Sequence, residues 1–242
     1  MENLLKVSNL SVVLDNQIII EDVSFEIGPK ETISIIGPNG AGKTVLLKTL
    51  IGAFKPTMGK IEFSEKAKVG YLPQRFSVDR YLAITVQEFL GLKPNINEEK
   101  MLEALSEVSL GKDFFKKPLA SLSAGQMQRV LIAWIISDKP NLILFDEPTE
   151  NVDVVGQESI YQLLRKLQND LNLSIILVSH DLNIVYKYSD KVICLNKKML
   201  CLGAPLETLD QKMLELIYGE HAYYAHDHHL VGNNHHNHHH DN

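Results

Sequence analysis

The stretch GPNGAGKT, residues 37 to 44, constrains the fold more than any other part of this 242-residue sequence. It fits the pattern G-x-x-x-x-G-K-[ST], and it stands between an apolar run, TISII, and a segment with helical periodicity. Gly37, Gly40 and Gly42 allow the backbone to curl around an anion, because no Cβ obstructs the N–H donors. The sequence therefore predicts a strand, a phosphate-binding loop and a helix in succession.

Two side chains of this loop extend the prediction to a nucleotide with its metal ion. Lys43 supplies a positive charge for the β and γ phosphates, and Thr44 offers a hydroxyl to Mg²⁺. The helix that follows directs the positive end of its dipole at the anion. The candidate nucleotide-binding residues of the loop are Gly37, Pro38, Asn39, Gly40, Ala41, Gly42, Lys43 and Thr44.

A second apolar run, NLILFDEP, ends in two adjacent carboxylates, Asp146 and Glu147. Consecutive side chains of a strand point to different sides, so the two carboxylates can divide their work. One can support the Mg²⁺ shell while the other reaches a water, as phosphoryl transfer requires. Together with the phosphate-binding loop, this pair favours nucleotide hydrolysis over a merely solvated strand end.

The overall composition excludes several classes of protein. The net charge of −6, from 24 basic and 30 acidic residues, provides no basic footprint, so we expect no nucleic-acid partner. No signal peptide opens the sequence, and the longest apolar run, VLIAWII at 130–136, is far shorter than the ~20 residues of a membrane-spanning helix. We therefore expect a cytoplasmic protein whose membrane role comes through a partner. Cys194 and Cys201 lack metal or redox spacing, and we expect small, buried, reduced side chains.

The order of periodic segments indicates an α/β protein with a helical interruption. Strands are expected at LLKVSNLSVVL, QIIIEDVSFEI, TISII, KIEF, KVGYLP, NLILFDEP and LSIILVSHD, and a hairpin at KVICLNKKMLCLGAP. Helices are expected after the phosphate-binding loop, in three segments between Thr85 and Ser137, at 153–168 and at ETLDQKMLELIYG. Continuous apolar strands separated by helices are typical of a parallel βαβ core.

Six motifs, in order, resemble those of the ATP-binding cassette (ABC) ATPases across nearly all of residues 4 to 219. They are GPNGAGKT, VGYLPQ with Gln74, LSAGQMQRV, LILFDEP, ENVD and LVSHD. The resemblance implies an α/β P-loop NTPase fold with a RecA-like core, an N-terminal antiparallel β-subdomain and an inserted helical subdomain. It implies one domain over residues 1–219, with the helical insertion at about 78–138, and a His-rich tail over 220–242.

The resemblance also implies roles for single residues. Asp146 is similar to the carboxylate that supports Mg²⁺, and Glu147 to the general base that polarises the attacking water. Gln74 resembles the residue that links Mg²⁺ and the γ-phosphate to the helical subdomain. His180, which follows an apolar strand, would by itself be a structural histidine, and in this order of motifs it resembles the one that contacts the γ-phosphate.

LSAGQ resembles the family signature that closes the ATP site of the opposite subunit, which implies a homodimer with two ATP molecules at its interface. Its residues Ser123, Ala124, Gly125 and Gln126 are therefore candidate nucleotide contacts, and Asp153 of ENVD fits the loop that crosses between subunits. Ala124 stands where the family usually has glycine; we expect hydrolysis to be retained. Leu14 stands where the family usually stacks an aromatic side chain on adenine.

Finer resemblance favours the ATPase subunits of metal-ion importers, particularly the zinc-uptake type. That reading implies a separate membrane permease, a solute-binding protein and a peripheral position on the cytoplasmic face of the inner membrane. A manganese or iron(II) importer remains an alternative, as does a soluble cassette protein of translation or DNA repair. An exporter is a further alternative.

Nine of the ten histidines lie in the last 22 residues, in HAYYAHDHHLVGNNHHNHHHDN. Neutral imidazoles are good Zn²⁺ ligands, with Asp227 and Asp241 as possible oxygen donors. The candidate zinc ligands are His226, His228, His229, His235, His236, His238, His239 and His240. A purification tag or an inert end are the alternatives. We hypothesise that the tail buffers or senses zinc.

Overall fold

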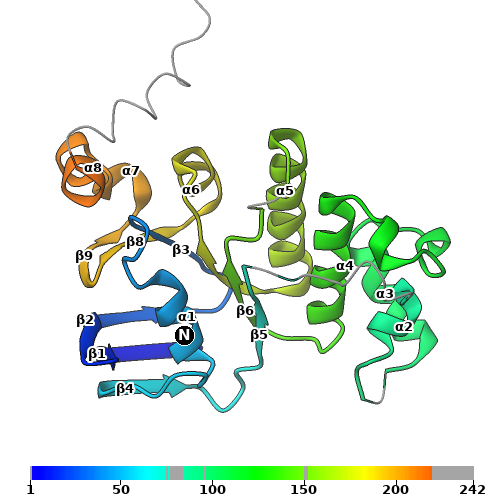
Figure 1. The fold of residues 1–242 in the computed structure, drawn as a ribbon, viewed down its shortest axis with the longest axis horizontal. Helices are drawn as coiled ribbons and strands as arrows, with labels where there is room; N and C mark the ends of the chain where they lie inside the picture. The colour runs from blue at the N-terminus through cyan, green and yellow to red at the C-terminus, as the bar shows by residue number, and fades with distance from the viewer. Residues whose placement is uncertain (1, 75, 77–83, 95, 150–151, 220–242) are drawn as a thin grey trace, which may run out of the picture.

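The computed structural model describes residues 2–74, 76, 84–94, 96–149 and 152–219 (Figure 1). Its strands are β1 (Leu5–Leu14), β2 (Gln17–Ile27), β3 (Thr32–Ile36), β4 (Met58–Phe63), β5 (Val69–Leu72), β6 (Leu142–Asp146), β7 (Ser174–Val178), β8 (Lys191–Asn196) and β9 (Lys198–Gly203). Its α-helices are α1 (Lys43–Leu50), α2 (Val86–Leu90), α3 (Glu98–Glu107), α4 (Ala124–Ile136), α5 (Val154–Leu171), α6 (Leu182–Tyr188), α7 (Pro205–Thr208) and α8 (Gln211–Tyr218).

The strands form one mixed sheet in the order β4-β1-β2-β9-β8-β3-β7-β6-β5. Strands β8, β3, β7, β6 and β5 run parallel to their neighbours within that set. Every residue of β3, β6 and β7 is buried. Their continuous apolar sequences suit strands covered on both faces, as the pattern predicted.

Alternate residues of the central strands enter two different apolar cores. Ile143 and Phe145 of β6 pack with α4 and α5, whereas Leu142 and Leu144 pack with α1 and the first two strands. This division follows from the two-residue period of a strand. The phosphate-binding loop and its helix are therefore anchored on one face of the sheet, and the long helix α5 on the other.

The first two strands form an antiparallel hairpin that extends the sheet, together with β4, at the end opposite α2, α3 and α4 (Figure 1). The turn between them places Asp15 and Asn16 at positive φ values of 48° and 60°. Such values are typical of a type I′ hairpin turn, which Asp and Asn tolerate. The predicted antiparallel N-terminal region is thus present.

Helices α2, α3 and α4 lie between β5 and β6 in the sequence and form a group at one side of the molecule (Figure 1). They share an apolar core with α5, to which Leu90, Leu105, Ile132 and Leu164 contribute. An inserted helical region is therefore confirmed as part of the fold. Its boundaries at about 78–138 stay a prediction, as does the tail of residues 220–242, which lies outside the described residues.

Two expectations about the C-terminal part are wrong. Cys194 and Cys201 form a disulfide, because the register of the β8–β9 hairpin places them opposite each other, and spacing alone does not reveal this. The segment ETLDQKMLELIYG, residues 207–219, is not one helix, because its first two residues end α7, and α8 begins only at Gln211. Asp210 ends the connection between them and caps α8 by accepting a hydrogen bond from Met213 N.

Candidate nucleotide site

Four parallel strands deliver the candidate residues to one edge of the sheet. The phosphate-binding loop begins directly after β3, and Asp146 ends β6. Gln74 and His180 each follow two residues after the ends of β5 and β7. Because β5, β6, β7 and β3 are successive parallel neighbours, their carboxyl ends meet at the same edge. Ligands of open α/β sheets bind at this edge.

The phosphate-binding loop adopts a backbone that requires glycine. Gly37, Gly40 and Gly42 have φ values of 154°, 79° and 98°. A Cβ on Gly37 would lie 1.9 Å from the carbonyl oxygen of Leu195, and one on Gly42 would lie 2.9 Å from that of Ile19. The loop therefore packs directly on the backbones of β8 and β2, which fixes its position relative to the sheet.

The Lys43 side chain folds back onto the phosphate-binding loop and bonds to its backbone. Its side chain is buried, and its Nζ donates to the carbonyl oxygens of Gly37 at 2.8 Å and Pro38 at 3.0 Å. Burial lowers the pKa of Lys43, while the negative charges of Glu147 and Asp146 act in the opposite direction. The ammonium group thus lies against the loop backbone, where it can also meet an anion held by that loop.

Asp146 is almost fully buried, and hydroxyl groups face both of its carboxylate oxygens. Thr44 Oγ1 donates to Oδ1 at 3.1 Å, and the Tyr71 hydroxyl donates to Oδ2 at 3.4 Å. Burial raises the pKa of Asp146, and the hydrogen bond from Thr44 opposes that shift. Burial also raises the pKa of Tyr71, with Asp146 adding to the effect, so Tyr71 remains a neutral donor.

Tyr71 is a site residue that the sequence did not reveal. Tyr71 belongs to β5 and lies three positions before Gln74, in a sequence that is typical of an ordinary strand. Only the parallel pairing of β5 with β6 brings its hydroxyl to Asp146. No signal in the local sequence distinguishes it from a core tyrosine.

The two remaining candidates, Gln74 and His180, both contact the carboxylate of Glu147. Its Oε1 lies 2.5 Å from His180 Nε2, and its Oε2 accepts a hydrogen bond of 3.1 Å from Gln74 Nε2. The hydrogen bond with His180 lowers the pKa of Glu147, and Lys43 and Gln74 act in the same direction. Glu147 is therefore held ionised. Asp146 and Glu147 have separate partners, and Glu147 itself lies just beyond the end of β6.

The segment Ser123 to Gln126 forms the start of α4. The Ser123 hydroxyl accepts from Gln126 N at 3.2 Å, and the Gln126 side chain accepts from Ser123 N at 3.1 Å, which is a capping box. Ala124 is the first helical residue and does not have a positive φ, so its Cβ causes no backbone strain. Ser123 and Ala124 are exposed, which leaves this helix start accessible to another molecule.

The other candidate residues fall in three places. Leu14 ends β1 and is partly buried against the core that contains α1. Asp153 is exposed and precedes α5 as its N-cap residue, without a side-chain capping bond. The tail candidates His226, His228, His229, His235, His236, His238, His239 and His240 lie outside the described residues.

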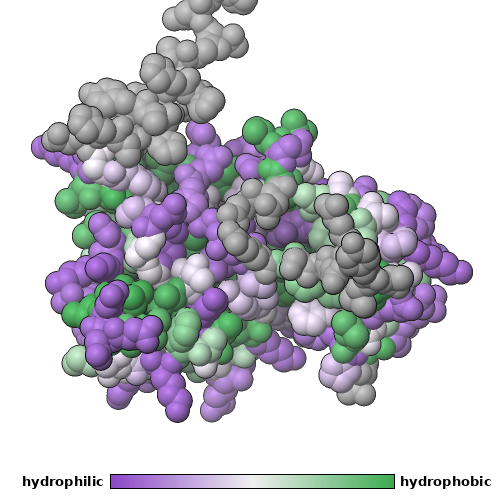
Figure 2. All heavy atoms as spheres, in the orientation of Figure 1, coloured by the Kyte–Doolittle hydropathy of each residue, from purple (hydrophilic) through white to green (hydrophobic). Residues whose placement is uncertain are grey.

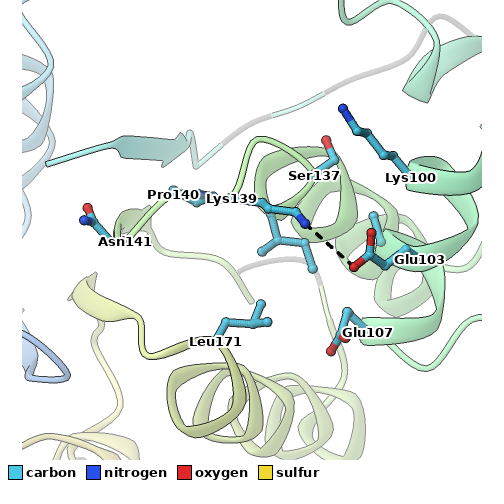
Figure 3. Close-up of a pocket in the computed structure, with 10 residues that line it drawn as sticks. Lys100, Glu103, Glu107, Ser137, Lys139, Pro140, Asn141 and Leu171 are labelled. Atoms are coloured by element: carbon cyan, nitrogen blue, oxygen red, sulfur yellow. Dashed lines mark ion pairs between the residues drawn. The ribbon is translucent and has the colours of Figure 1, made fainter. Parts of the chain in front are cut away.

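Another cavity lies away from the candidate nucleotide-binding residues, beside the amino end of β6, and it is larger than the one beside Glu147 and His180. It has a volume of about 290 Å³ and is lined by parts of α3, the end of α4 and the loop that leads to β6 (Figure 3). Lys139 and Glu103 point toward each other across it, with 3.9 Å between Nζ and Oε1. This cavity lies at the amino ends of the parallel strands, whereas the phosphate-binding loop lies at their carboxyl ends.

None of the helices described is long and apolar enough to span a membrane. Residues 2–219, apart from the undescribed positions, contain no group of three or more His, Cys, Asp and Glu side chains that could hold a metal ion.

Comparison with known proteins shows the family of the chain. The ABC transporter family matches residues 20–150. The zinc import ATP-binding protein ZnuC of Haemophilus influenzae is 38% identical over 230 residues, which covers 93% of this chain and 85% of that protein. A solved ABC transporter described as metal-chelate type, in an inward-facing conformation, superposes with a TM-score of 0.81 at 27% identity, covering 90% of this chain and 89% of its own.

A third relative is itself an isolated cassette. The dimeric structure of MJ0796, a bacterial ABC transporter cassette, has a TM-score of 0.69 at 26% identity and covers 83% of this chain and 98% of its own. The fold, the phosphate-binding loop and the relatives agree on one assignment. The chain belongs to the ABC transporter family and is an ATPase subunit that binds ATP together with Mg²⁺.

Proposed function

We propose that this protein is the ATP-hydrolysing subunit of a bacterial importer that takes up zinc through a separate membrane permease. The observation that carries the proposal is the convergence of the phosphate-binding loop, Asp146, Glu147 and His180 at one edge of the sheet. The cargo rests on relatives named for zinc import that align with 93% of the chain. Its place is then the cytoplasmic face of the inner membrane, with a solute-binding protein on the other side.

In this proposal the loop from Gly37 to Thr44 holds the phosphates of ATP. Lys43 would exchange its bonds to Gly37 and Pro38 for bonds to phosphate oxygens, since a phosphate is the stronger, charged acceptor. Leu14 supplies an apolar contact for the base without a π face. The bound nucleotide is thus positioned by backbone donors and one buried cation.

The residues around Asp146 fit Mg²⁺. The Thr44 hydroxyl and the Asp146 carboxylate are adjacent oxygen donors, the ligand type that Mg²⁺ prefers. When bound with ATP, Mg²⁺ neutralises charge that develops on the phosphate oxygens. Tyr71 orients the carboxylate from the opposite side, and Gln74 joins this region to the segment that leads to α2.

Glu147 is proposed to orient and polarise the attacking water. Its carboxylate is ionised, because the contact with His180 lowers its pKa, and an ionised carboxylate can accept the proton of a water. His180 and Gln74 fix its two oxygens, so the acceptor has a defined direction. His180 borders the same cavity as Glu147 and is proposed to contact the γ-phosphate.

The catalytic unit is proposed to be a homodimer in which each chain completes the other's site. At the exposed start of α4, the capping box does not use the N–H groups of Ala124 and Gly125, and the Ser123 hydroxyl can still donate, which suits a γ-phosphate. Figure 2 shows hydrophobic residues at one exposed end of α5, where Val154 and Val155 are 81% and 79% exposed. Exposed apolar residues next to Asp153, the predicted crossing point, favour a contact between subunits.

The His-rich tail is proposed to bind Zn²⁺ and to adjust uptake to the zinc supply. Its imidazoles are neutral near neutral pH and protonate below about pH 6, so zinc binding should weaken there. Deleting residues 221–242 should abolish submicromolar zinc binding and leave basal ATPase activity intact. Equal zinc affinity of the full and shortened chains would contradict a role in metal binding.

Growth of cells that lack this protein tests the cargo. Under metal chelation we expect poor growth that is rescued by added zinc and by the wild-type gene, and not by a Glu147→Gln variant that still binds ATP. Rescue by manganese or iron(II) instead of zinc would contradict the zinc assignment and leave the ATPase assignment standing.

A further inference from the structure

The segment from Glu147 to Asp153 connects the proposed catalytic carboxylate to α5. A side chain of α5 donates hydrogen bonds to backbone atoms of this segment. Gln157 lies one turn into the helix. Its Nε2 donates to the carbonyl oxygen of Thr149 at 3.1 Å and to that of Val152 at 2.9 Å. One amide group thereby satisfies two backbone acceptors on the described parts of this segment.

Tyr161 supplies a second attachment from the same face of the helix. Its hydroxyl lies 3.0 Å from Thr149 Oγ1, and both side chains are buried. Residues four apart on a helix are neighbours on its surface, so Gln157 and Tyr161 act on Thr149 side by side. A single residue, Pro148, separates Thr149 from Glu147, and its fixed φ limits the movement of Glu147 relative to Thr149.

The first turn of α5 is also pressed closely against this segment. A Cβ on Gly156 would lie 2.5 Å from Val152 Cγ1 and 2.7 Å from Asp153 Oδ1. Only glycine permits so close an approach without displacing the neighbours. Hydrogen bonds thus hold Thr149 and Val152, and close packing against Gly156 holds Val152 and Asp153.

Gln157 and Glu147 border the same cavity. A cavity of about 230 Å³ is lined by Gln157, Tyr161, Thr149, Glu147 and His180, among others. Gln157 therefore forms part of the wall of the cavity that Glu147 also borders.

Glu147 needs such support because its backbone is strained. Its φ is 52°, in the left-handed region that a non-glycine residue occupies only when its surroundings impose it. The bonds from Gln157 and Tyr161 restrain the chain two residues further on. From this geometry we propose that Gln157 is a positioning residue, which holds Glu147 in the conformation that meets His180 and the attacking water. The inference rests on the proposed role of Glu147.

The test compares Gln157→Met with Gln162→Met in the full-length protein. Methionine has a similar shape and no donor, and Gln162 is an exposed glutamine of the same helix whose amide donates to Glu158. Because Gln157→Met removes two hydrogen bonds without touching the phosphate-binding loop, we expect kcat to fall about tenfold or more. We expect KM for ATP to stay within about twofold, since ground-state binding is unchanged. Gln162→Met should match the wild type.

Two further variants make the outcome decisive. Tyr161→Phe removes the second attachment, and we expect a smaller loss of kcat, again at constant KM; it decides the question if Gln157→Met does not fold. Glu147→Gln tests the role on which the inference rests. If Glu147→Gln abolishes hydrolysis while Gln157→Met and Tyr161→Phe keep the wild-type kcat, the positioning role is wrong. If Glu147→Gln keeps hydrolysis, the proposed role of Glu147 is wrong instead.

Discussion

Gly37→Ala tests how tightly the phosphate-binding loop depends on the strand beside it. The new Cβ would lie 1.9 Å from the carbonyl oxygen of Leu195 and 3.1 Å from its carbonyl carbon. Both are backbone atoms of β8, which is paired on one side with β3 and on the other with β9. A change of side-chain rotamer at Leu195 therefore cannot relieve the clash, and the phosphate-binding loop itself must move.

Gly40→Ala is the matched comparison, because it makes the same chemical change in the same loop. Gly40 also has a positive φ, 79°, but a Cβ there would meet no atom within 4 Å. Both variants carry the backbone cost of a non-glycine residue at positive φ, about 1–3 kcal/mol. Gly37→Ala carries in addition an overpacking cost of about 1–3 kcal/mol.

The difference between the two variants should appear in thermal unfolding without nucleotide. For a chain of this size, about 1 kcal/mol corresponds to a Tm shift of ~2–4 °C, so Gly37→Ala should unfold roughly 2–12 °C below Gly40→Ala. Titration with a fluorescent ATP analogue should show that Gly37→Ala also binds nucleotide weakly, because its N–H donors are displaced. Equal Tm values for the two variants would refute the inference that the loop is fixed by contact with β8.

Three further predictions concern the surroundings of the phosphates. Tyr71→Phe removes a long hydrogen bond to Asp146, so the Mg²⁺ concentration for half-maximal ATPase activity should rise about twofold, corresponding to roughly 0.5 kcal/mol; an unchanged Mg²⁺ titration would exclude the contact. Ala124→Gly should leave turnover within about twofold, since Ala124 is already helical and unstrained; a rise from near-zero activity would show that the alanine disables the site. His180→Ala removes the contact that lowers the pKa of Glu147, so that pKa should rise, and the acid limb of the residual ATPase profile should move to higher pH. The wild-type carboxylate stays ionised to lower pH, and an acid limb that does not move would contradict this coupling.

Much of the fold and site could be predicted from local sequence, because the local patterns carry their own physics. Apolar runs such as TISII predict buried parallel strands, and the carboxyl ends of such strands meet at one edge of the sheet. The loop glycines have the positive φ values that an anion cradle needs. The capping box that Ser123 forms with Gln126 likewise follows from residues three apart.

What could not be predicted depends on pairing between distant segments. The contact of Tyr71 with Asp146 arises from the register of β5 against β6, and the Cys194–Cys201 disulfide from the register of the β8–β9 hairpin. The attachment of Thr149 by Gln157 depends on how a loop folds back on the helix that follows it. Such contacts have no periodicity of their own in the sequence, so only the assembled fold reveals them.

Zinc uptake into vesicles that contain the permease would show whether this ATPase site drives zinc import. The purified protein would be bound to the permease on the nucleotide side, and zinc accumulation and phosphate release would be measured together with Mg²⁺ and ATP. We expect ATP-dependent zinc accumulation with the wild type and none with Glu147→Gln, although that variant still binds ATP. Equal accumulation with both proteins, or ATP hydrolysis that never moves zinc, would contradict the claim that this site drives zinc import.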